Sequence, residues 1–231
     1  PLTYPGVKGA AKLFGIQLVP IRQKNGEISE EGLTAACRND GIKGLYLMPD
    51  LHNPTNHIMT TACRERIAEK AREYDLILLE DGINSLLLPQ PPRPIAALAP
   101  EHTVYMLSLS KTILPTLRLA YLLCPQRHRE RLENALYHLN LSQSPLLLEL
   151  ASRLIISGKL NGLLEKRRAG TLRRNQLAEE ILAGYALGGS GVCLSRWLRL
   201  PNGLSGAEFE RLARERGVSV YGSERFAVGK E

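Results

Sequence analysis

Short apolar runs alternate with amphipathic stretches through the first half of the chain, and their spacing predicts both strands and helices. Strands are expected at residues 17–20, 44–48, 76–79, 103–107 and 119–123. Helices are expected over residues 9–14, from a Ser29 cap to about Arg38, and after Thr60 or Thr61. This order is typical of βαβ units and therefore predicts an α/β fold around a parallel sheet.

The pattern changes in the second half, where residues 126–185 read as nearly continuous helix with interruptions near Ser144 and Ser157. A turn at 188–191, strands at 196–200 and 218–221 and a helix at 207–216 follow. We expect a large domain over residues 1–125, connecting helices over 126–162, and a small α+β domain over 163–231.

Composition and charge narrow the class of protein. No apolar run approaches the roughly 20 residues of a spanning helix, so a soluble protein without membrane contact is expected. The four cysteines stand far apart without a CxxC pair, which fits reduced cytosolic thiols and predicts a cytoplasmic location. The net charge of +7 suits an anionic ligand and leaves nucleic-acid contact open. The basic stretch at 165–174 has no aromatic neighbours and is interpreted as a solvated helix face. His52 and His57 are interpreted as solvated loop residues, so no metal site is predicted.

Polar side chains follow three of the predicted strands at the point where each strand ends. Because ligands of open parallel sheets bind beyond the carboxyl ends of the strands, we expect these side chains at one rim. They are Asn53, Asp81, Ser108, Ser110, Lys111 and, shortly beyond, Arg118. An amine forms an imine with an aldehyde, a carboxylate stabilises a protonated pyridine, and hydroxyls and a guanidinium bind phosphate. The set therefore suits a phosphorylated pyridine aldehyde.

Ordered motifs around these residues resemble those of a known family. Residues 108–118 (SLSKTILPTLR) resemble the SxSKxxxPGLR signature of fold-type I, class I/II aminotransferases. Residues 53–55 resemble their NPT motif, residues 80–84 their EDxxY loop, and residues 2–6 their PxYPG segment. The resemblance implies a three-layer fold of the PLP-transferase type, with a mostly parallel sheet flanked by helices and a smaller C-terminal α+β domain.

The resemblance also implies pyridoxal 5′-phosphate (PLP) as the cofactor and a role for each matching residue. Lys111 would be the catalytic residue, holding PLP as a Schiff base and later shuttling the proton. Asp81 would pair with the pyridine nitrogen, and Asn53 would donate to the phenolic oxygen.

The remaining cofactor contacts follow from the same motifs. Ser108 and Arg118 would hold the phosphate, with Ser110 beside them, and Tyr4 would stack near the ring. Asn84 stands where the family usually has a tyrosine that contacts the phenolic oxygen of PLP together with the asparagine. The electronic properties of the imine are therefore expected to differ.

The sequence also departs from the family at backbone positions and at its ends. Thr116 replaces the glycine of PGLR, which could disturb the turn before Arg118, and Asn56 replaces the glycine after NPT. Asparagine also accepts the left-handed conformation, so the second replacement is expected to be tolerated. The family's phosphate-cupping loop and late substrate-binding arginine would lie outside residues 1–231, so the chain is expected to be a fragment.

Three functions remain open at this point. The first is the PLP-binding effector domain of a GntR/MocR-type transcriptional regulator. The arginines that recur along the chain, and residues 96–103 before the lysine strand, resemble the sequences of such regulators. It would sense an amino-acid-like small molecule and contact DNA only through a missing N-terminal domain. The second is an aminotransferase acting on an amino acid and a 2-oxo acid, and the third a catalytically dead dimerisation scaffold. In each case the resemblance implies a homodimer.

Overall fold

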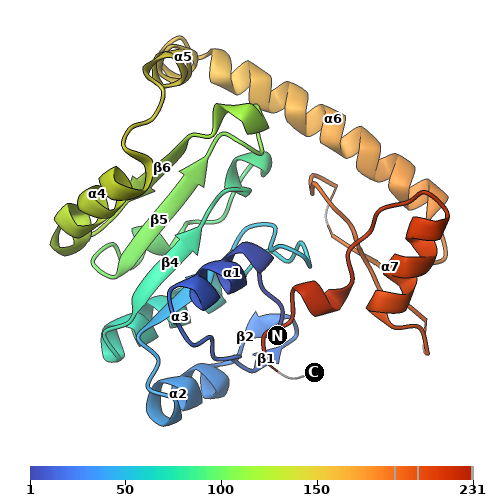
Figure 1. Cartoon of the computed structure of the whole chain (residues 1–231), viewed down its shortest axis with the longest axis horizontal. Helices are drawn as coiled ribbons and strands as arrows, with labels where there is room; N and C mark the ends of the chain where they lie inside the picture. Colours follow the sequence, from blue (N-terminus) through green and yellow to red (C-terminus); the bar gives the residue numbers. More distant parts are fainter. Residues whose placement is uncertain (190, 202, 230–231) are drawn as a thin grey trace.

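The computed structural model describes residues 1–189, 191–201 and 203–229, and its centre is a four-stranded sheet of order β3-β4-β5-β6 (Figure 1). Its strands are β3 (Gly44–Leu47), β4 (Ile77–Asp81), β5 (Thr103–Ser108) and β6 (Ala120–Leu123). The first three run parallel, and β6 is antiparallel to β5. The mostly parallel sheet that the sequence predicted is therefore present, and the expected strands at 44–48, 76–79, 103–107 and 119–123 are confirmed to within two residues.

Of the three helices of the first half, the second and third begin directly after the caps that the sequence predicted, whereas the first begins four residues before the expected residue 9. The helices are α1 (Pro5–Leu13), α2 (Glu30–Asn39) and α3 (Thr61–Glu73), with a short hairpin of β1 (Gln23–Lys24) and β2 (Glu27–Ile28) before α2. The Ser29 hydroxyl accepts from the Gly32 N–H at 3.0 Å, and the Thr60 hydroxyl accepts from the Cys63 N–H at 3.3 Å. Each side chain satisfies an N–H that has no partner inside its helix.

One face of the sheet is buried against α3. Leu45 and Leu78 point to this face and pack in one cluster with Ile67, Ala68 and Ala71 of α3. Side chains alternate between the faces of a strand, so the neighbouring positions point to the other face. There Ile77 and Leu79 are 36% and 38% exposed. The packing of α3 fixes the strands and so fixes where their carboxyl ends lie.

The second half is helical and then irregular. Its elements are α4 (Gln126–Asn140), α5 (Pro145–Ile156), α6 (Lys159–Ile181), β7 (Leu187–Gly188), β8 (Trp197–Leu198) and α7 (Gly206–Glu215). Both expected helix interruptions are confirmed, and α6 runs from α5 towards α7 as one long helix (Figure 1). The boundary expected between residues 162 and 163 falls inside α6. Among the described residues, no helix has the length and apolar character needed to span a bilayer.

The two ends of the described chain lie together. Thr3 N donates to Phe226 O at 2.8 Å, and Val228 N donates to Pro1 O at 3.0 Å. The Lys8 ammonium donates to Arg225 O at 3.0 Å. These contacts hold the C-terminal segment against the start of α1, and Figure 1 shows the described end of this segment near the N-terminus.

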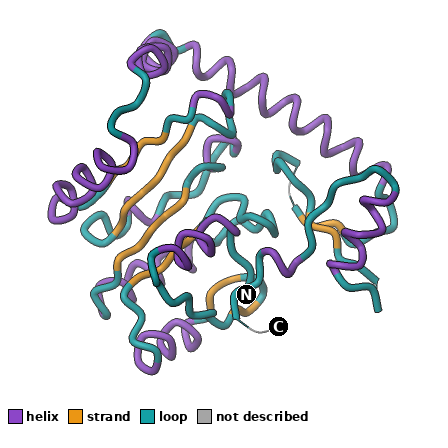
Figure 2. The backbone as a smooth tube through the Cα atoms, viewed as in Figure 1, coloured by secondary structure: helices purple, strands orange, loops and turns teal. Residues whose placement is uncertain are grey.

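Two predicted strands are absent from the described residues. Residues 17–20 and 218–221 are extended loop without a strand partner, and Figure 2 shows how much of the C-terminal segment is loop. Their apolar residues have the spacing of a strand, but no neighbouring strand supplies hydrogen bonds. The last long helix ends at Ile181 rather than near 185, with Gly184 following at φ 92°. The turn expected at 188–191 includes Ser190, which lies outside the described residues.

Candidate functional site

The loop after β3 carries Asn53 and is closed at its base. Met59 N donates to Pro49 O at 2.8 Å, so the two ends of the loop are joined. The peptide bond between Asn53 and Pro54 is cis. The loop therefore presents Asn53 as part of a closed turn at the carboxyl end of the sheet.

A buried arginine ties this loop to α3 and to the loop after β4. The Arg64 guanidinium donates to Met59 O and Pro49 O, both at 3.1 Å, and to the Asp50 carboxylate at 2.5 Å. The other Asp50 oxygen accepts from the Ser85 hydroxyl at 2.5 Å. Arg64 is 0% exposed and Asp50 3%, so the network that positions both loops is removed from water.

Asp81 is the last residue of β4, and both of its carboxylate oxygens have a donor. The Tyr46 hydroxyl donates to Oδ2 at 2.6 Å, and the Ile83 N–H donates to Oδ1 at 3.1 Å. Tyr46 lies opposite Leu79 in the parallel ladder, two residues before Asp81, so both side chains point to the same face. Burial, and then the neighbouring Asp81 charge, raise the pKa of Tyr46, which keeps its O–H as a donor.

Lys111 follows β5 in a loop that its neighbouring serines close. The Ser108 hydroxyl donates to Leu119 O at 2.7 Å and accepts from the Ser110 N–H at 3.1 Å. The Lys111 side chain is exposed, while its backbone carbonyl accepts from the Arg167 guanidinium at 3.2 Å. The loop fixes the backbone of Lys111 and leaves its amine accessible.

The backbone departures from the aminotransferase motifs are accommodated. Asn56 adopts φ 58°, in the left-handed region, as expected for a residue in the place of glycine. Thr116 lies in a short helical turn, Pro115–Leu117, and the left-handed residue is Arg118 at φ 49°. The concern about Thr116 is therefore not realised, because the turn does not need positive φ at that position.

Asn84 and Tyr4 complete the set of predicted residues. The Asn84 amide donates to Leu51 O at 3.0 Å, which links the loop after β4 to the loop after β3. The Tyr4 ring folds over Gly6, where a Cβ atom would lie only 2.3 Å from the ring. Gly6 thus allows Tyr4 to turn back over the start of α1.

A cavity of about 1440 Å³ lies between the sheet's carboxyl end and the C-terminal segment. Its walls include Tyr4, Asn53, Asp81, Asn84 and Lys111, so the structure brings these predicted residues together. Ser108, Ser110 and Arg118 are not among the described residues that line it.

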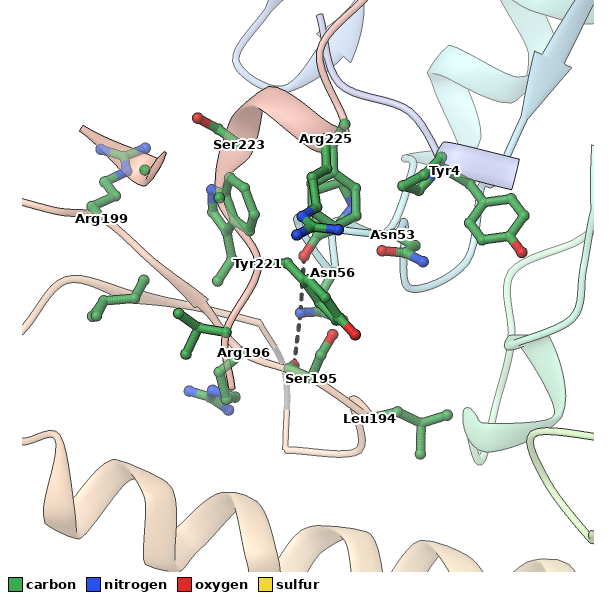
Figure 3. A pocket seen from close by; sticks show the side chains of 18 of the residues that line it. Tyr4, Asn53, Asn56, Leu194, Ser195, Arg196, Arg199, Tyr221, Ser223 and Arg225 are labelled. Atoms are coloured by element: carbon green, nitrogen blue, oxygen red, sulfur yellow. Dashed lines mark hydrogen bonds between the residues drawn. The ribbon is translucent and has the colours of Figure 1, made fainter. Parts of the chain in front are cut away.

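The opposite wall comes from residues that sequence reasoning did not single out. They include Trp197, Phe209, Tyr221 and Phe226. The Asn56 amide donates to Ser195 O at 2.9 Å, a bond drawn in Figure 3 that joins the two walls. Tyr46 was also missed. A tyrosine between the leucines of a short buried strand could have indicated a polar group that points from the sheet towards the site.

His52, next to Asn53, is partly buried rather than solvated as the sequence suggested, and it gives the stability of the fold a pH dependence. Burial and then the His57 charge lower the pKa of His52 to about 4, below the 6.5 of an ordinary histidine. The unfolded chain therefore binds this proton more tightly, so we expect stability to fall as pH drops from about 6.5 to 4, by roughly 3 kcal/mol. Urea unfolding at several pH values measures the loss, which His52→Gln should reduce. An NMR titration showing the His52 ring protonating near pH 6.5 would contradict this.

A mostly parallel sheet that presents an amine, a carboxylate and an amide to one cavity is the arrangement of fold-type I aminotransferases. The family model for aminotransferase class I and II matches residues 1–228, and the chain belongs to that family, whose cofactor is PLP. Among solved structures, the kynurenine aminotransferase of Pyrococcus horikoshii has a TM-score of 0.87 at 23% identity, covering 97% of this chain and 59% of that one. Likewise LysN, the α-aminoadipate aminotransferase of Thermus thermophilus, has a TM-score of 0.85 at 22% identity, covering 99% and 61%.

Curated relatives include regulators as well as enzymes. YdeF of Bacillus subtilis, an uncharacterized HTH-type transcriptional regulator, is 46% identical over 227 residues, which are 98% of this chain and 49% of YdeF. The 2-aminoadipate transaminase of Thermus thermophilus is 25% identical over 99% of this chain and 61% of that protein. The chain thus spans about half the length of YdeF.

The polar groups around the cavity fit the ring of PLP. Lys111 supplies a primary amine, Asp81 a carboxylate held by two donors, and Asn53 an amide, all in one cavity wall. These are the groups that an aldehyde, a pyridine nitrogen and a phenolic oxygen require. The described residues contain no cluster of His, Cys, Asp and Glu suited to a metal ion.

Proposed function

We propose that this chain is the PLP-binding, effector-sensing domain of a cytoplasmic GntR/MocR-type transcriptional regulator. The observation that carries the proposal is the 46% identity to YdeF over nearly the whole chain. The cavity lined by Lys111 and Asp81 supports the cofactor part of the proposal. DNA would be contacted through an N-terminal helix-turn-helix domain outside residues 1–231, and the protein would act as a homodimer.

Within this proposal each side chain has a defined task. When bound, PLP supplies an imine carbon and a ring that accepts electrons. The Lys111 Nζ would hold the cofactor as a Schiff base and then carry a proton at that nitrogen. Asp81 would accept from the pyridine N–H, with Tyr46 and the Ile83 N–H keeping its oxygens in place. Asn53 would donate to the phenolic oxygen.

The other predicted residues would act at the edges of the cofactor. Ser110 and Arg118 would contact the phosphate, together with Ser108, whose hydroxyl already holds the loop through Leu119 O. Tyr4 would cover the ring. Asn84 would act by fixing one loop against another rather than by replacing a tyrosine hydroxyl, because its amide donates to Leu51 O.

Replacing Lys111 tests the cofactor link. Purified protein incubated with PLP should show a visible absorption band, and borohydride reduction should add the cofactor's mass to the peptide that contains Lys111. Lys111→Ala should lose the band and the adduct completely, because no other group at that position can form the imine. Lys12→Ala, which removes an exposed lysine of α1 away from the cavity, is the matched control. A wild-type adduct on another lysine, or no adduct, would overturn the assignment.

The second candidate, an aminotransferase, is favoured by the similarity to the transaminase of Thermus thermophilus. The two candidates differ in what an amino compound does to the PLP-loaded protein. Conversion of a 2-oxo acid to an amino acid over many turnovers supports the enzyme. A change in DNA binding on adding the amino compound, without turnover, supports the regulator.

A further inference from the structure

A second, smaller concavity of about 300 Å³ lies between α6 and the loop that follows Lys111. Its lining consists of Thr112, Ile113, Leu163, Lys166, Arg167, Gly170 and Arg174. None of these residues is among those that line the larger cavity. The smaller concavity, called the α6 pocket below, is therefore distinct from the candidate cofactor site.

The charge of the α6 pocket has one sign. Residues 163, 166, 167, 170 and 174 follow the spacing of one helix face, which brings Lys166, Arg167 and Arg174 to the same wall. No described lining residue carries a carboxylate, and in the described part of the chain no acidic side chain pairs with these three cations. The neighbouring Arg168, in contrast, pairs with Glu165 at 3.3 Å. Among the described residues, the positive charge of the pocket thus has no acidic partner within ion-pair distance.

Two buried polar groups, one in the loop and one in α6, also lack partners. Thr112 is 1% exposed, and its hydroxyl has no hydrogen-bond partner among the described residues. The Arg167 Nε–H is likewise buried without a partner, while another nitrogen of the same guanidinium donates to Lys111 O. Buried polar groups are nearly always hydrogen-bonded, and an exception calls for a bound water or ion. The Arg167 Nε–H can only donate, and the Thr112 hydroxyl can donate as well as accept, so one bound acceptor group would satisfy both.

We propose that the α6 pocket binds a small phosphate group, as free phosphate or as part of a small phosphorylated molecule. A phosphate offers several acceptor oxygens, and its double negative charge matches a wall with three cations better than a single carboxylate would. Small side-chain movements would bring the Thr112 hydroxyl and the Arg167 Nε–H into contact with it. The Arg167 guanidinium also donates to the Lys111 carbonyl. A phosphate bound in the α6 pocket would therefore shift the backbone of Lys111 when it moves Arg167. Binding at the pocket itself does not depend on the proposed function.

Thr112→Val and Arg174→Gln test the pocket in the purified protein. Titration with inorganic phosphate at constant ionic strength should show saturable binding, weakened about tenfold or more by each variant, since each removes a donor to a charged group. Arg173→Gln removes the same charge one residue away, from an exposed side chain outside the lining, and should change the affinity less than about twofold.

Thr112→Val also separates binding from folding. Without phosphate its melting temperature should equal or exceed that of the wild type, because a buried unpaired hydroxyl becomes a methyl group. With saturating phosphate the order should reverse. The proposal fails if Thr112→Val and Arg173→Gln bind phosphate equally, if acetate binds as tightly as phosphate, or if only duplex DNA binds.

Discussion

Replacing Arg64 by methionine should lower the free energy of unfolding by about 3–5 kcal/mol. The substitution keeps an apolar stem of similar length but leaves the Asp50 carboxylate, 3% exposed, without its cation. Pro49 O and Met59 O lose a donor as well. A buried charge without a partner is among the most costly single changes, because neither water nor another charge replaces the lost contact. Urea unfolding with linear extrapolation measures the loss.

Arg72→Met is the matched control on the same helix. Arg72 pairs with Glu101 at 2.7 Å at the surface, where its side chain is 48% exposed, and such pairs contribute about 0–1 kcal/mol. If Arg64→Met costs no more than Arg72→Met, the buried network does not stabilise the fold. Because Arg64 joins both ends of the loop that carries Asn53, Arg64→Met should also weaken cofactor binding, whereas Arg72→Met should not.

The central sheet and the long helices could be predicted because their signals are local. The short apolar run at 44–48 and the caps at Ser29 and Thr60 each determine an element from a few neighbouring residues. The strands expected at 17–20 and 218–221 failed for the opposite reason. A strand needs a hydrogen-bonding neighbour, and apolar spacing does not show whether one is available. Val218, for example, donates its N–H back to Ala213 at the end of α7 instead.

Only part of the site could be predicted from the sequence, and there is a physical reason why some of its residues were found and others were missed. Asn53, Asp81 and Lys111 were found because parallel strands bring the residues after their carboxyl ends to one rim. Ser108 was placed at the same rim, but its hydroxyl is directed to Leu119 O, a contact that only the three-dimensional turn determines. The aromatic wall around Trp197 comes from a C-terminal segment that lines the same cavity, and no spacing in the sequence indicates that this segment reaches it.

Tyr46→Phe should weaken the binding of PLP by about tenfold or more while keeping the fold. The change removes only the hydroxyl that donates to Asp81 Oδ2 at 2.6 Å, and a hydrogen bond to a charged group contributes about 1.5–3 kcal/mol. Asp81 would then be free to turn about its remaining contact with the Ile83 N–H, and its carboxylate would meet the pyridine nitrogen less often. Absorbance titration with PLP measures the affinity, and thermal unfolding of the cofactor-free protein tests the fold.

Two measurements show whether Tyr46 acts through Asp81 or merely fills space. Tyr74→Phe removes a partly buried hydroxyl just after α3, outside the described lining of the cavity, and should leave PLP affinity unchanged. The raised pKa of Tyr46 means that its phenol stays protonated while exposed tyrosines ionise. An alkaline ultraviolet titration of Tyr46→Phe should therefore show the same amplitude below about pH 11 as the wild type. Equal PLP affinities for Tyr46→Phe and Tyr74→Phe, or a lost phenol signal in Tyr46→Phe, would show that the hydroxyl does not hold Asp81 in place.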